Sequence, residues 1–312
     1  MRYNNPVFIC GALRSGTTVL HLMLDNHEQI NNPGEFDFLF DFIKADNHYP
    51  DPDQFISWLN SNRIFLSHNI PIIHPKPCFE DIIIDLVASY SRSGALTSLT
   101  IHRNFHLVPN FFPDSRYVHL LRDPRDVARS SIPMGWAGNV WYGVDHWIDT
   151  EKSWDKLQSI LDPEQYIEIH YEELMQNPES ILIDVCSFLE IPYSNTMLSY
   201  PDHSTYAGPD PTLTEQWKLK SNPKDVRLIE NKASTLMKAR GYDISFTNAL
   251  PPSFPKRIYL ALQNKTYRAI FGAKRYGLPL YIIDRLSRRF GPDKLRSYCH
   301  SRMDEIDISY LK

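Results

Sequence analysis

A glycine-bracketed loop near the start of the chain constrains the fold more than any other feature. The apolar run Val7–Cys10 is followed by Gly11 and Gly16 in the pattern G-x-x-x-x-G, and an apolar helix pattern begins at Thr17. In a strand–loop–helix unit of this kind, backbone N–H groups point into the loop and the helix dipole adds partial positive charge. The sequence therefore predicts a phosphate-type anion site at the end of the first strand.

The residues of this loop narrow the choice of anion. A nucleotide triphosphatase carries a lysine directly after the second glycine, where this chain has Thr17. Arg14 is the only cation between the two glycines, and the hydroxyls of Thr17 and Thr18 are available in the first turn of the helix. This set suits one tetrahedral anion and its transferable group better than a triphosphate. The alternative interpretation is a glycine turn with a surface arginine.

Alternating strand and helix patterns predict the fold class. We expect strands at 7–10, 98–102, 116–121 and 165–171, and helices at 17–26, 53–60, 80–90, 123–130 and 178–189. Alternation implies right-handed crossovers between parallel strands. The predicted fold is α/β: a P-loop-type three-layer sandwich with a central parallel sheet flanked by helices, plus a C-terminal helical extension. In such sheets ligands bind beyond the carboxyl ends of the strands, where the motifs of this chain fall.

Composition excludes several classes of protein. The net charge of −4 over 312 residues gives no general case for nucleic-acid binding. No apolar run approaches the ~20 residues of a transmembrane helix, and the polar start does not resemble a signal peptide. The four cysteines form no metal-type pair, so we interpret them as reduced thiols. These features predict a cytoplasmic protein without a transmembrane segment.

The charge is spread unevenly along the chain. From Pro251 onward there are 13 Lys and Arg residues against 5 Asp and Glu, a net charge of +8, whereas the first 250 residues carry −12. The prolines of 251–255 mark a boundary because closely spaced prolines cannot continue a helix. We predict a main domain at 1–250 and a basic helical C-terminal extension at 251–312. The extension is either a packed appendage or homodimer contact, or an attachment to an anionic membrane or acidic acceptor.

A second motif, RDPRDVARS at 122–130, contains another candidate anion site. Arg122 lies at a strand end and Ser130 about two helical turns later, so both can converge on one phosphate. By itself the motif is equally compatible with a solvated helix start, with Asp123 as its cap.

Together the two motifs resemble the sulfotransferases that use 3′-phosphoadenosine 5′-phosphosulfate (PAPS). RSGTT at 14–18 matches the 5′-phosphosulfate loop of that family, and RDPRDVARS matches its 3′-phosphate element. HYEEL at 170–174, CSFLEIPY at 186–193 and QWK at 216–218 are similar to later landmarks of the family. The likeness covers about residues 5–245 and is closest to the bacterial and tyrosylprotein-type branch, which has arginine in the loop.

The resemblance implies which residues bind the PAPS co-substrate, with no metal required. The 5′-phosphosulfate would be held by the loop residues Arg14, Ser15, Gly16, Thr17 and Thr18. Arg122 and Ser130 would bind the 3′-phosphate, Tyr171 would contact the adenine ring, and Lys218 would lie near a phosphate. Tyr171 is equally compatible with a half-buried strand-end tyrosine, and the segment around Lys218 with a polar connector.

Sulfuryl transfer needs donors at the bridging oxygen and a base for the acceptor, and three residues are predicted to be catalytic. Arg14 would stabilise the growing negative charge. Glu35 stands in the GE context that holds the general base in the tyrosylprotein-type branch, although a carboxylate at a helix N-terminus explains it too. His102 ends a strand where relatives carry a lysine or histidine that contacts the sulfonate, but IHRN departs from their usual K-D-P or K-T-P. His102 is also the rival candidate for the base, because a neutral histidine can accept a proton. We rank Glu35 first as base and His102 as sulfonate contact.

Two other functions are compatible with the same loop. A P-loop small-molecule kinase using ATP has the same kind of anion-binding loop, but this interpretation does not explain the second anion site at Arg122 and Ser130. A binding protein would keep the nucleotide site without chemistry. The acceptor, with a hydroxyl or amine, is a carbohydrate, a lipid-linked sugar, a peptide tyrosine or a small natural product. The glycine-broken segment 133–143 is a candidate mobile lid over it.

Overall fold

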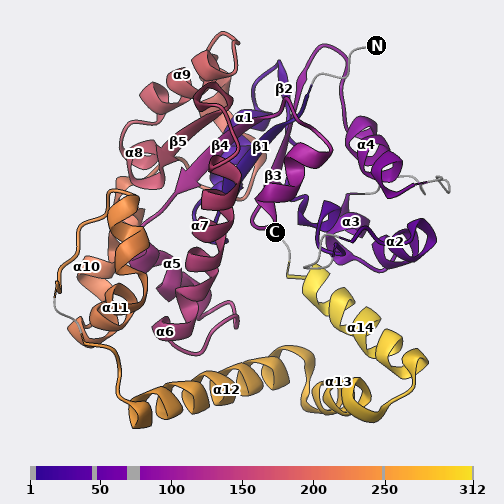
Figure 1. Ribbon diagram of the computed structural model, residues 1–312, viewed down its shortest axis with the longest axis vertical. Coiled ribbons are helices and arrows are strands. Elements are labelled where there is room, and N and C mark those ends of the chain that lie inside the picture. The colour runs from indigo at the N-terminus through magenta and orange to yellow at the C-terminus, as the bar shows by residue number, and fades with distance from the viewer. Residues whose placement is uncertain (1–4, 44–47, 69–77, 248–249, 311–312) are drawn as a thin grey trace.

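The computed structural model describes residues 5–43, 48–68, 78–247 and 250–310. Its centre is one sheet of five parallel strands in the order β2-β3-β1-β4-β5 (Figure 1). The strands are β1 (Val7–Gly11), β2 (Ile30–Asn31), β3 (Leu96–Ile101), β4 (Arg116–Leu121) and β5 (Tyr166–His170). The predicted parallel sheet is confirmed, and the bounds of the four predicted strands differ from expectation by at most two residues; β2 was not among them.

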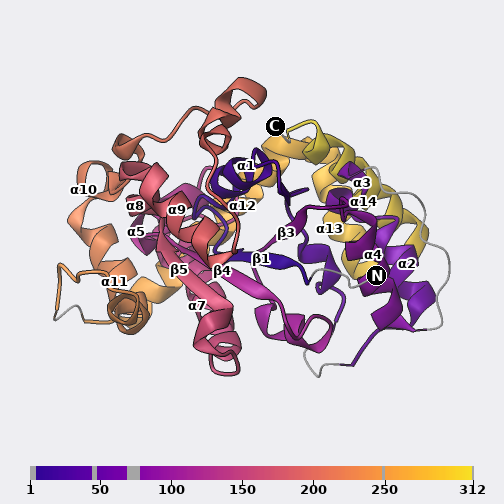
Figure 2. The ribbon, with the colours of Figure 1, turned by 90° about the horizontal axis from the view of Figure 1, so that it is seen from above.

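Helices cover both faces of the sheet because the strands alternate apolar side chains between two cores. Val7 and Ile9 of β1 pack with α1 (Thr17–Asp25), α8 (Tyr171–Gln176) and α9 (Pro178–Phe188). Phe8 and Cys10 point to the opposite face, into a core that includes residues of α2 (Pro52–Leu59), α3 (Arg63–Ser67), α4 (Phe79–Ser89) and α7 (Asp145–Gln158). Figure 2 shows the sheet between these groups of helices. The three-layer sandwich predicted from the sequence is thus confirmed.

A third core packs at the carboxyl end of the sheet. It joins Ala12 of the glycine loop to α5 (Pro124–Ser131), α6 (Val140–Gly143), the first part of α7, and α11 (Pro223–Ala239). The short helix α10 (Gln216–Lys220) packs against α5. Asp123 caps α5 through a bond from the Arg125 N–H to its carboxylate (2.8 Å), and Pro124 occupies the first turn.

The C-terminal extension is helical, as predicted. It consists of α12 (Phe254–Tyr276), α13 (Leu278–Phe290) and α14 (Asp293–Ile308), which run below the α/β body from the side of α11 to α3 (Figure 1). Asp307 of α14 pairs with Arg63 of α3, at 2.7 Å. Among the residues that the structure describes, no helix combines the length and apolar character needed to cross a bilayer.

The segment 133–143, expected to be a mobile lid, is instead fixed by α12. The Gly138 N–H donates to Asn264 Oδ1 at 2.7 Å, and Asn139 Nδ2 donates to the Leu260 carbonyl at 2.8 Å. A Cβ on Gly135 would lie 2.2 Å from the ring of Phe271. Gly135 and Gly138 therefore serve close packing against the extension, which the sequence pattern alone does not distinguish from mobility.

Candidate active site

The glycine loop joins β1 to α1 and leaves the N-terminus of α1 open. Gly16 is the N-cap residue with φ of 95°, and no side chain caps the helix. A Cβ at this position would lie 2.3 Å from the ring of Tyr171, so both backbone conformation and space require glycine. The first N–H groups of a helix lack partners within the helix, so they remain available to an anion.

The two predicted anion motifs lie in direct contact. Arg14 Nε donates to Ser130 Oγ at 2.9 Å, and Arg122 Nη1 donates to the Arg14 carbonyl oxygen at 3.0 Å. The Arg122 guanidinium lies 4.1 Å from the centre of the Tyr171 ring and also donates to the Leu213 carbonyl, at 3.1 Å. Residues 108 positions apart thus form one cationic surface next to the open end of α1.

Several polar atoms at this surface lack a protein partner. Ser15 Oγ and Arg122 Nε are buried and form no hydrogen bond with any residue that the structure describes. Buried donors are normally paired, so an unpaired arginine N–H and an unpaired hydroxyl beside an open helix N-terminus indicate a polar ligand. An anion with several acceptor oxygens, such as a phosphate or a phosphosulfate, fits this donor set.

A buried histidine lies on the other side of the loop. His102, just after β3, is 2% exposed, and its Nε2 lies 3.2 Å from Thr17 Oγ1. Asp37, in a single 3₁₀ turn at Asp37–Leu39, accepts from the His102 backbone N–H at 2.8 Å and contacts its Nδ1 at 2.7 Å. Glu35 extends the sheet by a parallel bridge to Thr100. One carboxylate oxygen of Glu35, one of Asp37 and one ring nitrogen of His102 all lie within 4.8 Å of one another. The two candidate bases are therefore neighbours.

The neighbouring charged side chains shift the pKa values of His102 and Asp37 in opposite directions. Burial lowers the pKa of His102, but Asp37 and Glu35 outweigh burial, and the pKa is raised above its ordinary value. Burial raises the pKa of Asp37, but the imidazole of His102 and the guanidinium of Arg103 together hold that pKa below its ordinary value. His102 therefore favours the imidazolium form with Nδ1–H on Asp37, and its second N–H faces the loop.

Asp37 was not predicted from the sequence. Its signal is the run F-D-F-L-F at 36–40, in which one acid stands among aromatic and apolar residues that are each no more than 1% exposed. An ionisable group enclosed in this way needs a partner, and that partner is His102. We interpret Asp37 as a positioning residue, which fixes the tautomer and orientation of the imidazole.

Tyr171 and Lys218 have different surroundings. Tyr171, only 4% exposed, packs against Gly16 and below Arg122. Lys218 is exposed and pairs with Glu215 at 2.6 Å. Its neighbour Trp217 is anchored, because its backbone N–H donates to Asp126 Oδ1 at 2.7 Å and the Arg125 guanidinium lies 3.6 Å from its ring centre. The predicted roles of Tyr171 and Lys218 in nucleotide binding stay predictions.

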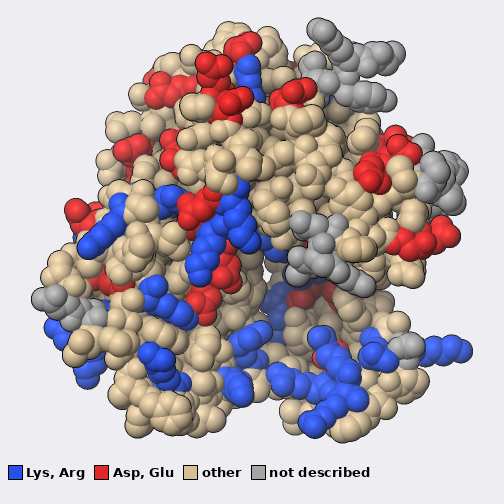
Figure 3. Space-filling model, in the orientation of Figure 1, with Lys and Arg blue, Asp and Glu red and all other residues tan. Residues whose placement is uncertain are grey.

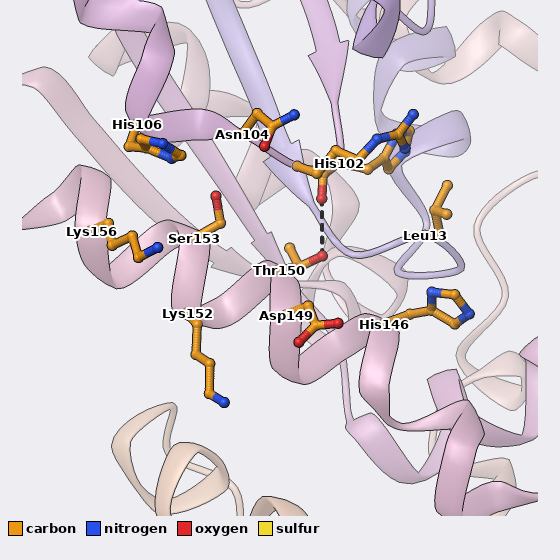
Figure 4. Close-up of a pocket in the computed structure, with 11 residues that line it drawn as sticks. Leu13, His102, Asn104, His106, His146, Asp149, Thr150, Lys152, Ser153 and Lys156 are labelled. Atoms are coloured by element: carbon orange, nitrogen blue, oxygen red, sulfur yellow. Dashed lines mark hydrogen bonds between the residues drawn. The ribbon is translucent and has the colours of Figure 1, made fainter. Parts of the chain in front are cut away.

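A cavity of about 400 Å³ opens beside His102 (Figure 4). It is lined by Leu13 of the loop, by the segment after β3, and by α7, whose Lys152 and Lys156 are both exposed. Thr150 of α7 donates to the His102 carbonyl at 3.0 Å, which fixes α7 against the end of β3 (Figure 4). The cavity therefore touches both the anion loop and the candidate sulfonate contact.

Comparison with known proteins agrees with this geometry. A model of the sulfotransferase family matches residues 6–195, more than half of the chain. The chain belongs to the sulfotransferase family. The prediction of a PAPS-dependent sulfotransferase is confirmed at the level of the family, and nothing in the comparisons supports the kinase alternative.

Individual relatives are distant from this sulfotransferase. It is 25% identical over 215 residues to an uncharacterised protein of Aquifex aeolicus. The match covers 62% of this chain and 26% of the Aquifex protein. It is 23% identical over 245 residues to a putative protein-tyrosine sulfotransferase of Caenorhabditis briggsae (75% of this chain, 80% of that one). In fold it is similar to the sulfotransferase domain of the curacin biosynthetic pathway, with a TM-score of 0.58, 18% identity, and coverage of 78% and 100%.

Proposed function

We propose that this member of the family transfers the sulfonate group of PAPS to a hydroxyl or amine acceptor in an in-line reaction. The observation that carries the proposal is the contact between the two anion motifs, Arg14 with Ser130 and Arg122 with the Arg14 carbonyl. A ligand with anionic groups at two places, such as PAPS, uses such a surface better than a single phosphate does. The family match supports the same donor.

Each group at the site has a proposed task. Arg14 and the open N–H groups of α1 hold the 5′-phosphosulfate, with Ser15, Thr17 and Thr18 as hydroxyl donors. Arg122 and Ser130 hold the 3′-phosphate. Because these donors are fixed before the reaction, they stabilise the charge that grows on the bridging oxygen without reorganisation. Tyr171 and Lys218 are proposed to contact the adenine and a phosphate.

The acceptor side is proposed to use Glu35 and His102. Because the neighbouring carboxylates raise the pKa of His102, we assign this histidine a hydrogen bond to the transferring sulfonate in preference to the role of base. Glu35, half-buried beside it, is then the base that takes the acceptor proton. This division agrees with the ranking expected from the sequence.

We propose that the acceptor enters the cavity beside His102. Its lysines and histidines suit a polar acceptor, and a peptide tyrosine, a sugar or a small natural product remains compatible. The cationic donor set supports transfer without a metal. Four free thiols, with no disulfide among them, support a cytoplasmic location. The division into a main domain at 1–250 and an extension at 251–312 also stays a proposal.

Calorimetric titration with 3′-phosphoadenosine 5′-phosphate in metal-free buffer tests the donor site. Tight binding is expected for the wild type, and a loss of at least about tenfold in affinity for Arg122→Ala. The matched control is Arg116→Ala, because Arg116 begins the same strand, β4, and pairs with Glu190 away from the site. Stronger binding of ATP with Mg²⁺, or equal losses in both variants, would overturn the PAPS assignment.

A further inference from the structure

The helix α13 presents most of its apolar side chains outward. Asp284 and Ser287 are 6% and 2% exposed. Five apolar side chains of the same helix are 43–77% exposed, whereas Leu280 and Tyr281 are half-buried; the five are Leu278, Ile282, Ile283, Leu286 and Phe290. A surface helix of a globular protein normally shows the reverse arrangement, with apolar side chains buried and polar side chains exposed. The exposed residues require an apolar surface from outside the chain, or else they are an aggregation hazard.

The exposed apolar residues form one continuous arc. At about 100° per residue they span roughly 140° of the helix circumference. Arg285 and Arg289 lie at one edge of this arc, with Arg288 beyond them, and all three are exposed. Asp284 is the only acidic residue of α13, and it is buried and bonded to Arg288 Nε at 2.9 Å. The outer face of α13 therefore combines apolar side chains with the positive charges of Arg285 and Arg289, which form no ion pair with the described residues.

The preceding helix, α12, also has an exposed apolar row. Phe254, Ile258 and Leu262 form an exposed row on α12 at spacing i, i+4, i+8, and are 46–76% exposed. Figure 3 shows blue Lys and Arg side chains gathering along the lower part of the molecule, over the region of α12, α13 and α14. The segment from Pro251 onward has a net charge of +8.

We propose that the outer face of α13 docks on the surface of an anionic lipid bilayer. An apolar arc edged by arginines is the pattern of a helix that lies in the plane of a membrane interface, with its side chains inserted between the lipids. Anionic headgroups complement the arginines. A two-fold interface between two copies of this chain would bring together two faces that both carry arginines, and the one acidic residue of α13, Asp284, is buried, so like-charge repulsion disfavours it. The helices of the extension would then hold the enzyme at the membrane without crossing it.

Vesicle flotation with the full chain tests the proposal. Wild-type protein is mixed with vesicles of phosphatidylcholine containing about one third phosphatidylglycerol, and with vesicles of phosphatidylcholine alone. We expect a partition ratio at least about tenfold higher for the anionic vesicles. Ile282→Gln/Leu286→Gln should lower it by at least about tenfold, and Arg285→Gln/Arg289→Gln by about 30-fold.

Two control variants separate α13 from the rest of the surface. Leu219→Gln removes an apolar side chain that is 88% exposed on α10, and Lys224→Gln/Lys238→Gln removes two exposed cations from α11. Both should bind vesicles within about twofold of wild type. Light scattering records the oligomeric state of every variant, and circular dichroism verifies folding. Absence of vesicle binding, equal losses in the controls, or a dimer that Ile282→Gln/Leu286→Gln dissociates would overturn the proposal.

Discussion

Replacing Asp37 with asparagine tests whether His102 is held as a cation. The two oxygens of Asp37 contact the His102 backbone N–H at 2.8 Å and Nδ1 at 2.7 Å. Asparagine has only one acceptor oxygen. If that oxygen keeps the backbone bond, the amide NH₂ group faces Nδ1, which must then accept a hydrogen bond. The variant should therefore leave the imidazole neutral.

The size of the effect follows from the charges. Two opposite charges about 4 Å apart are worth about 4 kcal/mol at an effective dielectric constant near 20, and removing one partner of a buried pair costs about 3–5 kcal/mol. Since asparagine retains one hydrogen bond and the side-chain volume, we expect a loss of about 2–4 kcal/mol in the free energy of unfolding.

The dependence on pH has a defined sign. The folded pKa of His102 is raised, so its contribution to stability is complete below the unfolded value of 6.5 and is lost as the pH rises through the folded pKa. The folded pKa of Asp37 is lowered, so its contribution is present above the unfolded value of 3.8 and is lost as the pH falls through the folded pKa. The cost of the variant should be largest between these two unfolded values and should shrink toward alkaline pH.

Chemical denaturation followed by tryptophan fluorescence, at about pH 5, 7 and 9, measures this cost. Asp149→Asn is the control, because Asp149 is exposed and lines the same cavity. A cost that stays constant over this range, or that grows with pH, would refute the idea that Asp37 holds a proton on His102.

Further predictions concern the glycine loop, a buried histidine of the sheet, and whether turnover depends on a metal ion. Arg14→Ala should slow PAPS turnover by roughly 10²-fold, or about 3 kcal/mol, measured as release of the desulfonated nucleotide. Gly16→Ala should destabilise by about 2–4 kcal/mol in thermal unfolding, because it adds a clash with Tyr171 to the strain of positive φ; Gly94→Ala, with φ of 82° and open space around it, should cost about 1–2 kcal/mol. His119→Gln should cost more stability at about pH 5.5 than at about pH 8.5, because nearby carboxylates raise the pKa of this histidine despite burial, so its contribution disappears as pH rises through the folded pKa. Turnover should be unchanged by EDTA, and a loss that Mg²⁺ restores would contradict metal-free transfer.

Local patterns predicted the elements because they depend on neighbours in the sequence. The apolar run at 116–121 matches β4, and the Asp-Pro pair at its end correctly marked the start of α5. The helix expected at 17–26 ends at Asp25. In each case periodicity or a cap alone determines the outcome.

Other features depend on partners far away in the sequence and could not be predicted in this way. The link between Asp37 and His102 joins two segments 65 positions apart. The glycines of 133–143 predict a bend, but they do not tell whether the segment is mobile or packed. The segment is packed because α12 lies against it. The amphipathic pattern of α13 predicts a helix, but it does not tell which face is turned toward the rest of the chain. In the structure the buried side chains include Asp284 and Ser287, whereas a surface helix usually buries its apolar face.

The order of the strands explains why one loop can serve both parts of the proposed reaction. β1 lies between β3 and β4, with Cys10 opposite Ile101 on one side and Gly11 opposite Leu120 on the other. This register places His102, one residue beyond β3, against Thr17. It also places Arg122, one residue beyond β4, against the carbonyl of Arg14. A loop on an edge strand would have a neighbouring strand end on one side only. Because the glycine loop follows the central strand, it meets the cationic surface on the side of β4 and the histidine and carboxylates on the side of β3. A donor nucleotide and an acceptor can therefore approach the same anion from opposite sides, as an in-line transfer requires.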